Sequence, residues 1–103
     1  MLFGKVTGTV VSTRKDEKLE GLTLLLVQQV DARGKMTNQY VVAADAMGAG
    51  MGEMVMFATG SSARQTDKTE NRPIDAVIMA IVDTWEIEGD VVYDKYGADT
   101  VHA

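Results

Sequence analysis

The sequence predicts an all-β protein, a small five-stranded OB-like β-barrel with a short helical turn and a C-terminal β-ribbon. Strand-like segments recur along the chain, and glycine-containing or charged turns separate them. The length of 103 residues suits one domain only. Because a chain of this size buries only roughly 60–68% of its unfolded surface, a partner subunit would add stability that the core alone lacks.

The first expected strand spans residues 2–13, where small or apolar residues alternate with polar ones. Gly4 and Gly8 fall on the face predicted to be buried, which indicates a close approach of other atoms or a bend. Residues 14–20 contain six charged side chains and end at Gly21. We expect this charged segment to be a solvent-exposed loop.

The next two strands are predicted to form a hairpin. An apolar run covers residues 22–30, and a partner strand is expected over residues 39–44. Between them, Asp31 can bond its own backbone and Gly34 can adopt positive φ, which is typical of a tight turn. A fourth strand is expected over residues 53–59.

The last third of the chain predicts one helical turn, one buried strand and one hairpin. Residues 61–65 suit a single helical turn with a serine as its N-cap, and the polar segment 65–72 is expected to be mobile. The most apolar run, residues 76–82, predicts a strand buried on both faces. A small hairpin follows, with strands at residues 84–87 and 91–93.

These segments divide the chain into an OB-like barrel domain, residues 1–87, and a C-terminal ribbon with an acidic tail, residues 88–103. Residues 88–103 hold four acidic residues against one lysine, so they carry −3 of the net charge of −5. A negative chain works against nucleic acid as a partner. The sequence has no cysteine, which fits a reducing cytoplasm, and no apolar run approaches a membrane span. We therefore expect a cytoplasmic protein without a nucleic-acid or membrane partner.

One glycine-rich motif invites comparison with phosphate-binding loops. Gly48, Gly50 and Gly52 alternate along the chain and Glu53 follows them, and glycines let backbone amides approach a phosphate. A dinucleotide site needs a helix after the glycines, and a P-loop needs a lysine. Here a strand is expected instead and no lysine follows. We interpret the motif as a structural turn between two strands.

A second motif consists of Gly60, Ser61, Ser62, Ala63 and Arg64. Its hydroxyls, amides and guanidinium could together cradle an anion. The interpretation we favour is a helix start whose arginine pairs with a carboxylate, for example across a subunit boundary. On this interpretation the motif contributes to assembly and has no ligand of its own.

Catalytic machinery is not expected. The single histidine, His102, lies next to the C-terminus, where an ordered triad or zinc site is least favoured. A serine nucleophile in residues 60–64 would lack a base. Nothing in the pattern brings together any two of the carboxylates near expected strand ends, which are Asp45, Glu53, Asp75 and Asp83. We predict that the protein is not an enzyme and has no catalytic residue, cofactor or metal site.

An alternative function is an OB-type binding module for single-stranded nucleic acid or a sugar. Trp85, Tyr93 and Tyr96 could stack bases in the groove of such a module. The two tyrosines, however, lie in the most acidic part of the chain, which would repel a polyanion.

Five groups of residues occur in a fixed order between residues 1 and 87. They are 8–15, 19–21 with 24–27, 48–53, 60–64, and 73–75 with 81–83. Together they resemble the vertex-protein family of bacterial microcompartments and carboxysomes, of the ethanolamine-utilisation and carboxysome-vertex type. One departure is Met79-Ala80, where the family commonly has a glycine-containing pair.

The resemblance implies a shell component that forms a ring of five and closes the vertices of a polyhedral shell. Its partners would be four further copies of itself, hexameric shell proteins and the enzymes that the shell encloses, all within the cytoplasm. A cyclic ring uses two unlike faces of each subunit and can stabilise a small core. On this basis Gly60, Ser61, Ser62, Ala63 and Arg64 become candidates for subunit contacts or the ring axis, and residues 48–53 a turn that sets the shape.

Overall fold

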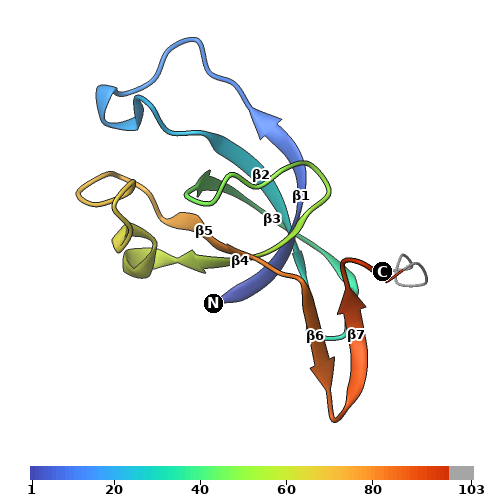
Figure 1. Ribbon diagram of the computed structural model, residues 1–103. Coiled ribbons are helices and arrows are strands. Elements are labelled where there is room, and N and C mark those ends of the chain that lie inside the picture. The colour runs from blue at the N-terminus through green and yellow to red at the C-terminus, as the bar shows by residue number, and fades with distance from the viewer. Residues whose placement is uncertain (98–103) are drawn as a thin grey trace.

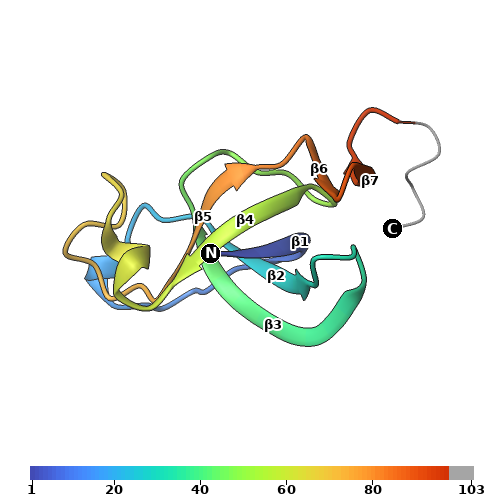
Figure 2. The same cartoon turned by 90° about the horizontal axis from the view of Figure 1, so that it is seen from below.

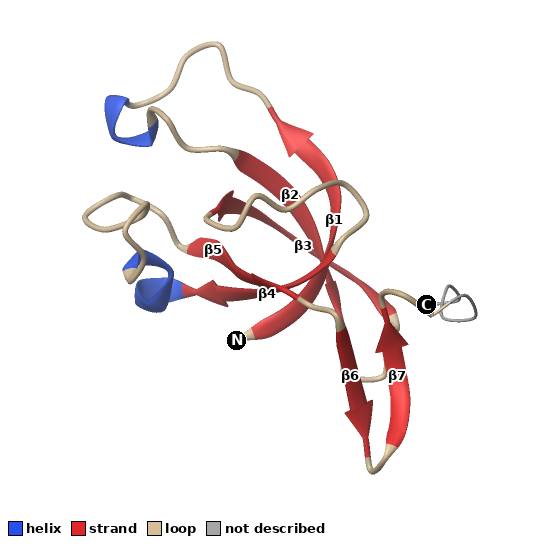
Figure 3. Ribbon diagram, in the orientation of Figure 1, coloured by secondary structure: helices blue, strands red, loops and turns tan. Residues whose placement is uncertain are grey.

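Five strands close into a barrel, and two more form a separate ribbon (Figures 1 and 3). The computed structural model describes residues 1–97. Around the barrel the strands follow the order β1-β2-β3-β5-β4, and the ribbon pairs β6 with β7. The bounds are Leu2–Val10 for β1, Leu24–Val30 for β2, Met36–Asp45 for β3, Met54–Thr59 for β4, Ala76–Ile81 for β5, Thr84–Ile87 for β6 and Asp90–Asp94 for β7. The predicted all-β architecture is confirmed.

Two 3-10 helices, η1 (Glu17–Leu19) and η2 (Gly60–Arg64), are the only helices in the described part of the chain. Neither is long and apolar enough to cross a membrane. The ribbon begins at Thr84, so its first strand lies on the barrel side of the boundary drawn between residues 87 and 88.

The interior of the barrel is filled by apolar side chains from all five strands. Gly4 of β1 points into this interior, where an added Cβ would lie 2.4 Å from Val27 Cγ1 and 2.9 Å from Phe57 Cε1. The predicted close approach at Gly4 is therefore confirmed. The buried members of this core are Val6, Leu25, Val27, Ala43, Val55, Phe57, Ala76 and Ile78.

A second apolar cluster covers one outer side of the barrel, beneath the charged loop and η2. Its buried members are Ala44, Ala58, Ala63, Ile74 and Val77. Leu19 from the charged loop packs against it, and the Arg72 guanidinium donates hydrogen bonds to the carbonyls of Lys18 and Glu20 at 3.0 and 2.6 Å. The charged side chains of residues 14–20 are exposed, as expected. The backbone of this segment is held in place by the packing of Leu19 and by the hydrogen bonds from Arg72.

The third cluster joins the ribbon to the barrel. The Trp85 ring stacks on Phe3 of β1 with centroids 4.0 Å apart, and Tyr93 of β7 stacks on Trp85 at 5.4 Å. The indole nitrogen of Trp85 also donates to the Ala32 carbonyl at 2.8 Å. These contacts cover Val30, Met54 and Val82, which are buried beneath the ribbon.

The largest differences between the observed and the expected strand boundaries are at the end of the first strand and at the start of the third. The first strand ends at Val10 rather than residue 13, because Val10 pairs with Leu24 and β2 has no residue beyond that point to pair with. The third strand begins at Met36 rather than residue 39, because the turn is tight enough for Met36 to pair with Val30. The Asp31 carboxylate accepts hydrogen bonds from two amides of this turn, as its turn chemistry predicts.

The polar segment 65–72 contains a side chain that polarity alone does not reveal as buried. Thr69 is fully buried, and its hydroxyl donates to the Ala63 carbonyl at 2.6 Å. Its amide also donates to the Thr66 hydroxyl at 3.1 Å. A segment expected to be mobile is therefore attached to η2 through the buried side chain of Thr69.

Candidate functional site

The motif of residues 60–64 forms η2, directly after β4. The predicted serine N-cap is wrong, because Thr59 occupies that position and makes no side-chain capping bond. The turn starts earlier than expected because Gly60 adopts φ +66° and its amide donates to the Asp75 carbonyl at 2.8 Å. Ala63 is buried against the barrel, while Ser61 and the other polar residues of the motif are exposed.

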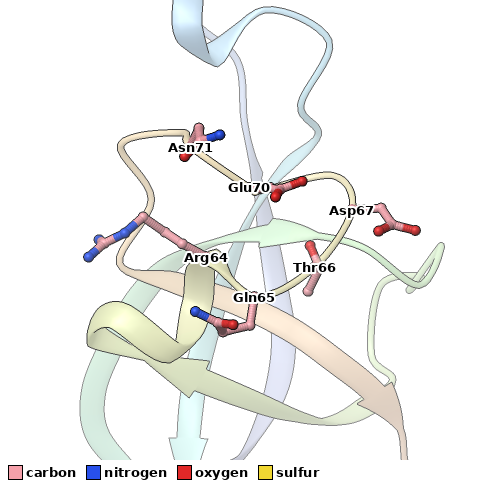
Figure 4. A pocket seen from close by; sticks show the side chains of 6 residues that line it. All are labelled: Arg64, Gln65, Thr66, Asp67, Glu70 and Asn71. Carbon is pink, nitrogen blue, oxygen red and sulfur yellow. The ribbon is translucent and has the colours of Figure 1, made fainter.

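Arg64 and the loop that follows η2 line a polar cavity of about 380 Å³ (Figure 4). One Arg64 nitrogen donates to the Ile74 carbonyl at 3.2 Å, and Figure 4 shows the side chain directed away from Asp67 and Glu70. The lining combines one cationic and two acidic residues, which gives an anion no net attraction. The lining residues are Arg64, Gln65, Thr66, Asp67, Glu70 and Asn71.

The amides at the start of the glycine-rich turn are bound within the chain. The buried Asp45 carboxylate accepts hydrogen bonds from the amides of Met47, Gly48 and Ala49 at 2.9, 3.0 and 2.9 Å. A loop whose amides already bind a carboxylate cannot offer them to a phosphate. This contact favours the structural interpretation of the turn over a phosphate-binding one.

The end of the turn is held on β1. The Gly52 amide donates to the Val6 carbonyl at 2.8 Å, and the Val6 amide donates to the Glu53 carbonyl at 3.0 Å. Gly48 and Gly52 adopt φ +75° and +82°, which non-glycine residues rarely adopt. Gly50 has no positive φ, but its amide bonds to the Glu53 carboxylate.

Glu53 also joins the turn to the ribbon. Its carboxylate forms a 2.8 Å ion pair with the Lys95 ammonium, and the Lys95 amide donates to the Asp83 carbonyl at 2.8 Å. The Lys95 and Gly50 contacts lower the pKa of Glu53, and the Glu53 carboxylate raises the pKa of Lys95. Sequence analysis missed this pair, because nothing local indicates that residues 42 positions apart meet.

We expect the stabilising effect of the Glu53 carboxylate to disappear in acid. The pKa of Glu53 is lower in the folded chain, so its contribution is present above the ordinary carboxyl pKa of about 4.3 and is lost as the pH falls through the lowered value. Glu53→Gln should therefore lower the melting temperature at pH 7, and its difference from wild type should be smaller at pH 3. Circular dichroism melts would measure this, with Glu86→Gln, which changes an exposed carboxylate of β6, as the control. A difference from wild type that is equal at both pH values would contradict the expectation.

Several of the groups considered for catalysis or base stacking are bound to other groups of the chain. No cluster of three metal-ligating side chains occurs within residues 1–97, and His102 lies outside that described range. The Asp45 carboxylate is bound by amides, and Phe3 and Tyr93 both stack on Trp85. The Trp85 ring is therefore not free to stack on a nucleic-acid base.

Comparison with known proteins gives a consistent family match. The model of the family described as "Ethanolamine utilisation protein EutN/carboxysome" matches residues 1–83. The carboxysome shell vertex protein CcmL of Gloeobacter violaceus is 45% identical over 95 residues, which are 92% of this chain and 95% of that protein. The bacterial microcompartment shell vertex protein EutN of Salmonella typhimurium is 41% identical over 95 residues, which are 92% of this chain and 96% of that protein.

Solved structures show the same likeness in three dimensions. The structure of the Gloeobacter violaceus CcmL protein matches with a TM-score of 0.89 at 45% identity and covers 92% of this chain and 98% of that one. The GrpN pentameric microcompartment shell protein from Rhodospirillum rubrum matches with a TM-score of 0.78 at 45% identity, over 84% of this chain and 99% of that one.

Proposed function

The chain belongs to the ethanolamine utilisation EutN/carboxysome family, and we propose that it is a structural protein that forms the pentameric vertices of a bacterial microcompartment shell. The observation that carries this proposal is the likeness of its whole barrel to shell vertex proteins and to a shell protein named as pentameric. The proposal places the protein in a shell within the cytoplasm, as a non-catalytic component.

The physical properties of the chain support a role in assembly. A barrel of this size has a modest core, and a ring adds buried surface at each subunit boundary. Hexagonal tiles alone form a flat sheet, so a closed shell needs five-fold units at its corners. The proposed partners are therefore hexameric shell proteins beside the ring and the enzymes enclosed by the shell.

Native mass spectrometry tests the proposal directly. At micromolar concentration in a volatile buffer of moderate ionic strength, we expect a species of five times the 11.1 kDa chain. A stable monomer under these conditions would overturn the pentamer. Mixing the protein with hexameric shell proteins of the same shell and imaging closed particles by electron microscopy would test the vertex role itself.

Within the ring, we place Gly60, Ser61, Ser62, Ala63 and Arg64 at a subunit contact or near the axis. The exposure of the polar residues of η2 supports this placement. So does Arg64, whose guanidinium makes one hydrogen bond to its own chain and points away from the nearby carboxylates (Figure 4). Residues 48–53 act as a turn that fixes the shape of the barrel edge, and residues 1–87 form the vertex domain with residues 88–103 as its extension.

Replacing Arg64 with alanine should weaken ring assembly more than it unfolds the subunit. Removing one side of a charged contact between subunits costs about 2 kcal/mol or more, whereas the single bond to Ile74 is worth about 1 kcal/mol. The matched control is Arg72→Ala, because Arg72 binds two carbonyls of its own chain and should mainly affect folding. Native mass spectra and melting curves of both variants measure the difference. An Arg64→Ala protein with a lower melting temperature and an unchanged ring would contradict the placement.

A further inference from the structure

One edge of β3 has a partner strand only at its C-terminal end, as far as residues 1–97 show. On one side β3 pairs with β2 from Met36 to Ala44, but on the other side it pairs with β5 only at Ala44 and Asp45. In Figure 2, β3 bows away from β4 and β5 before it reaches that short junction. We call residues 39–43, which precede the junction, the open edge.

The register identifies which backbone groups face outward along the open edge. The Asp45 amide donates to the Thr23 carbonyl, and in an antiparallel pair alternate residues bond to the same neighbour. Ala44, Val42 and Tyr40 therefore direct their amides and carbonyls away from β2. Ala44 pairs with β5 there, whereas no strand within residues 1–97 lies opposite Val42 and Tyr40.

The side chains of the same two residues are exposed and apolar. Tyr40 and Val42 are 53% and 47% exposed and lie two positions apart, so they share one face of β3. Residues 36–44 contain no charged residue and no proline, although charged residues make up 24% of the chain. Edge strands of proteins that remain monomeric usually carry charges or proline, which prevent pairing with other chains. The open edge has neither.

A groove of about 380 Å³ runs beside the open edge. It separates β3 from the end of β4 and the start of β5, and Asp75 is its only charged lining residue. Gly60, the first residue of the η2 motif, forms part of the opposite wall. The lining residues are Val41, Val42, Thr59, Gly60, Asp75 and Ala76.

We propose that the open edge and this groove form one of the two faces through which neighbouring subunits contact each other in the ring. The occupant is a second copy of this chain, and the inference rests on the proposed pentamer. A ring requires every subunit to present an unlike pair of faces, and the centre of such an interface is depleted of charge. If the partner bound only transiently, the unpaired edge would be exposed to other chains whenever that partner dissociated. In a ring, a neighbouring copy covers the edge of every subunit.

The test replaces Val42 with lysine and compares it with Val91→Lys. Val91 is 61% exposed, is also a strand valine and lies on the ribbon, away from the open edge. At micromolar concentration, native mass spectrometry should show Val42→Lys mainly as monomers, at least about tenfold weaker in assembly, and Val91→Lys as intact rings. A Val42→Lys protein that assembles like wild type would overturn the proposal, and so would equal dissociation of both variants.

Amide hydrogen exchange of the wild-type protein tests the same face without a substitution that risks unfolding. In the ring, the amides of Tyr40 and Val42 should be protected to a degree similar to that of Val41, which faces β2. Exchange of Tyr40 and Val42 at the rate of an open chain, within an intact ring, would overturn the proposal. A wild-type protein that is not a pentamer would instead overturn the proposed function, so the two failures are distinguishable.

Discussion

Alanine at Gly4 is expected to lower the free energy of unfolding by about 2–3 kcal/mol, since overpacking a filled core costs about this much. The added Cβ would lie 2.4 Å from Val27 Cγ1, 2.9 Å from Phe57 Cε1 and 3.2 Å from the Gln28 carbonyl oxygen. Val27 and Phe57 are fully buried, so neither can move without displacing other core side chains. Urea denaturation followed by circular dichroism would measure the loss.

Gly8→Ala is the matched control, because Gly8 lies on the same strand and has no positive φ. Its added Cβ would lie 3.4 Å from the Leu26 Cβ, which is an ordinary contact. The effect should stay within about 0.5 kcal/mol, since alanine also restricts the unfolded chain. Both variants need the same subunit concentration, because assembly contributes to stability. Equal losses at the two positions would contradict the argument from packing.

Trp85→Ala should cost about 3 kcal/mol, at the lower end for loss of a large aromatic side chain. The substitution removes the stack with Phe3 and Tyr93 and the hydrogen bond to the Ala32 carbonyl. It also exposes the cluster around Val30 that the ribbon covers. Thermal melts would give the loss, and limited proteolysis would show whether the ribbon becomes easier to cleave.

Trp85→Phe separates the two contributions at this position. Phenylalanine keeps a ring against Phe3 but lacks the indole N–H that bonds to Ala32. We expect it to recover most of the stability and to remain about 1 kcal/mol below wild type. If the alanine variant melted like wild type, the ribbon would not depend on this stack for its attachment.

Local sequence patterns predict much of the barrel because they reflect local physical causes. Asp31 and Gly34 predict the hairpin turn because their side-chain chemistry acts within a few residues. Alternation predicts that Gly4 faces the interior. The sequence predicts that the helical turn begins one residue later than it does. The reason is that the serines indicated an N-cap, whereas the turn begins at Gly60, whose positive φ the pattern does not indicate.

The contacts that sequence analysis missed join residues far apart in the chain. The Glu53 ion pair with Lys95 and the Trp85 bond to Ala32 depend on how the ribbon folds back onto the barrel. No periodicity carries that information. The burial of Thr69 likewise depends on a carbonyl of η2 that the fold brings near. The roles of residues 60–64 and 48–53 remain predictions, since they concern contacts with other subunits and the shape of the ring.

The junction of β3 with β5 also determines when the barrel can close as the chain is made. It consists of two residue pairs, Ala44 with Val77 and Asp45 with Ile78, and β5 is the last barrel strand to leave the ribosome. Without β5 the earlier strands can form at most an unclosed sheet, whose apolar inner face would be accessible to other nascent chains. Closure of the barrel therefore waits for β5, which follows the other four barrel strands in the sequence.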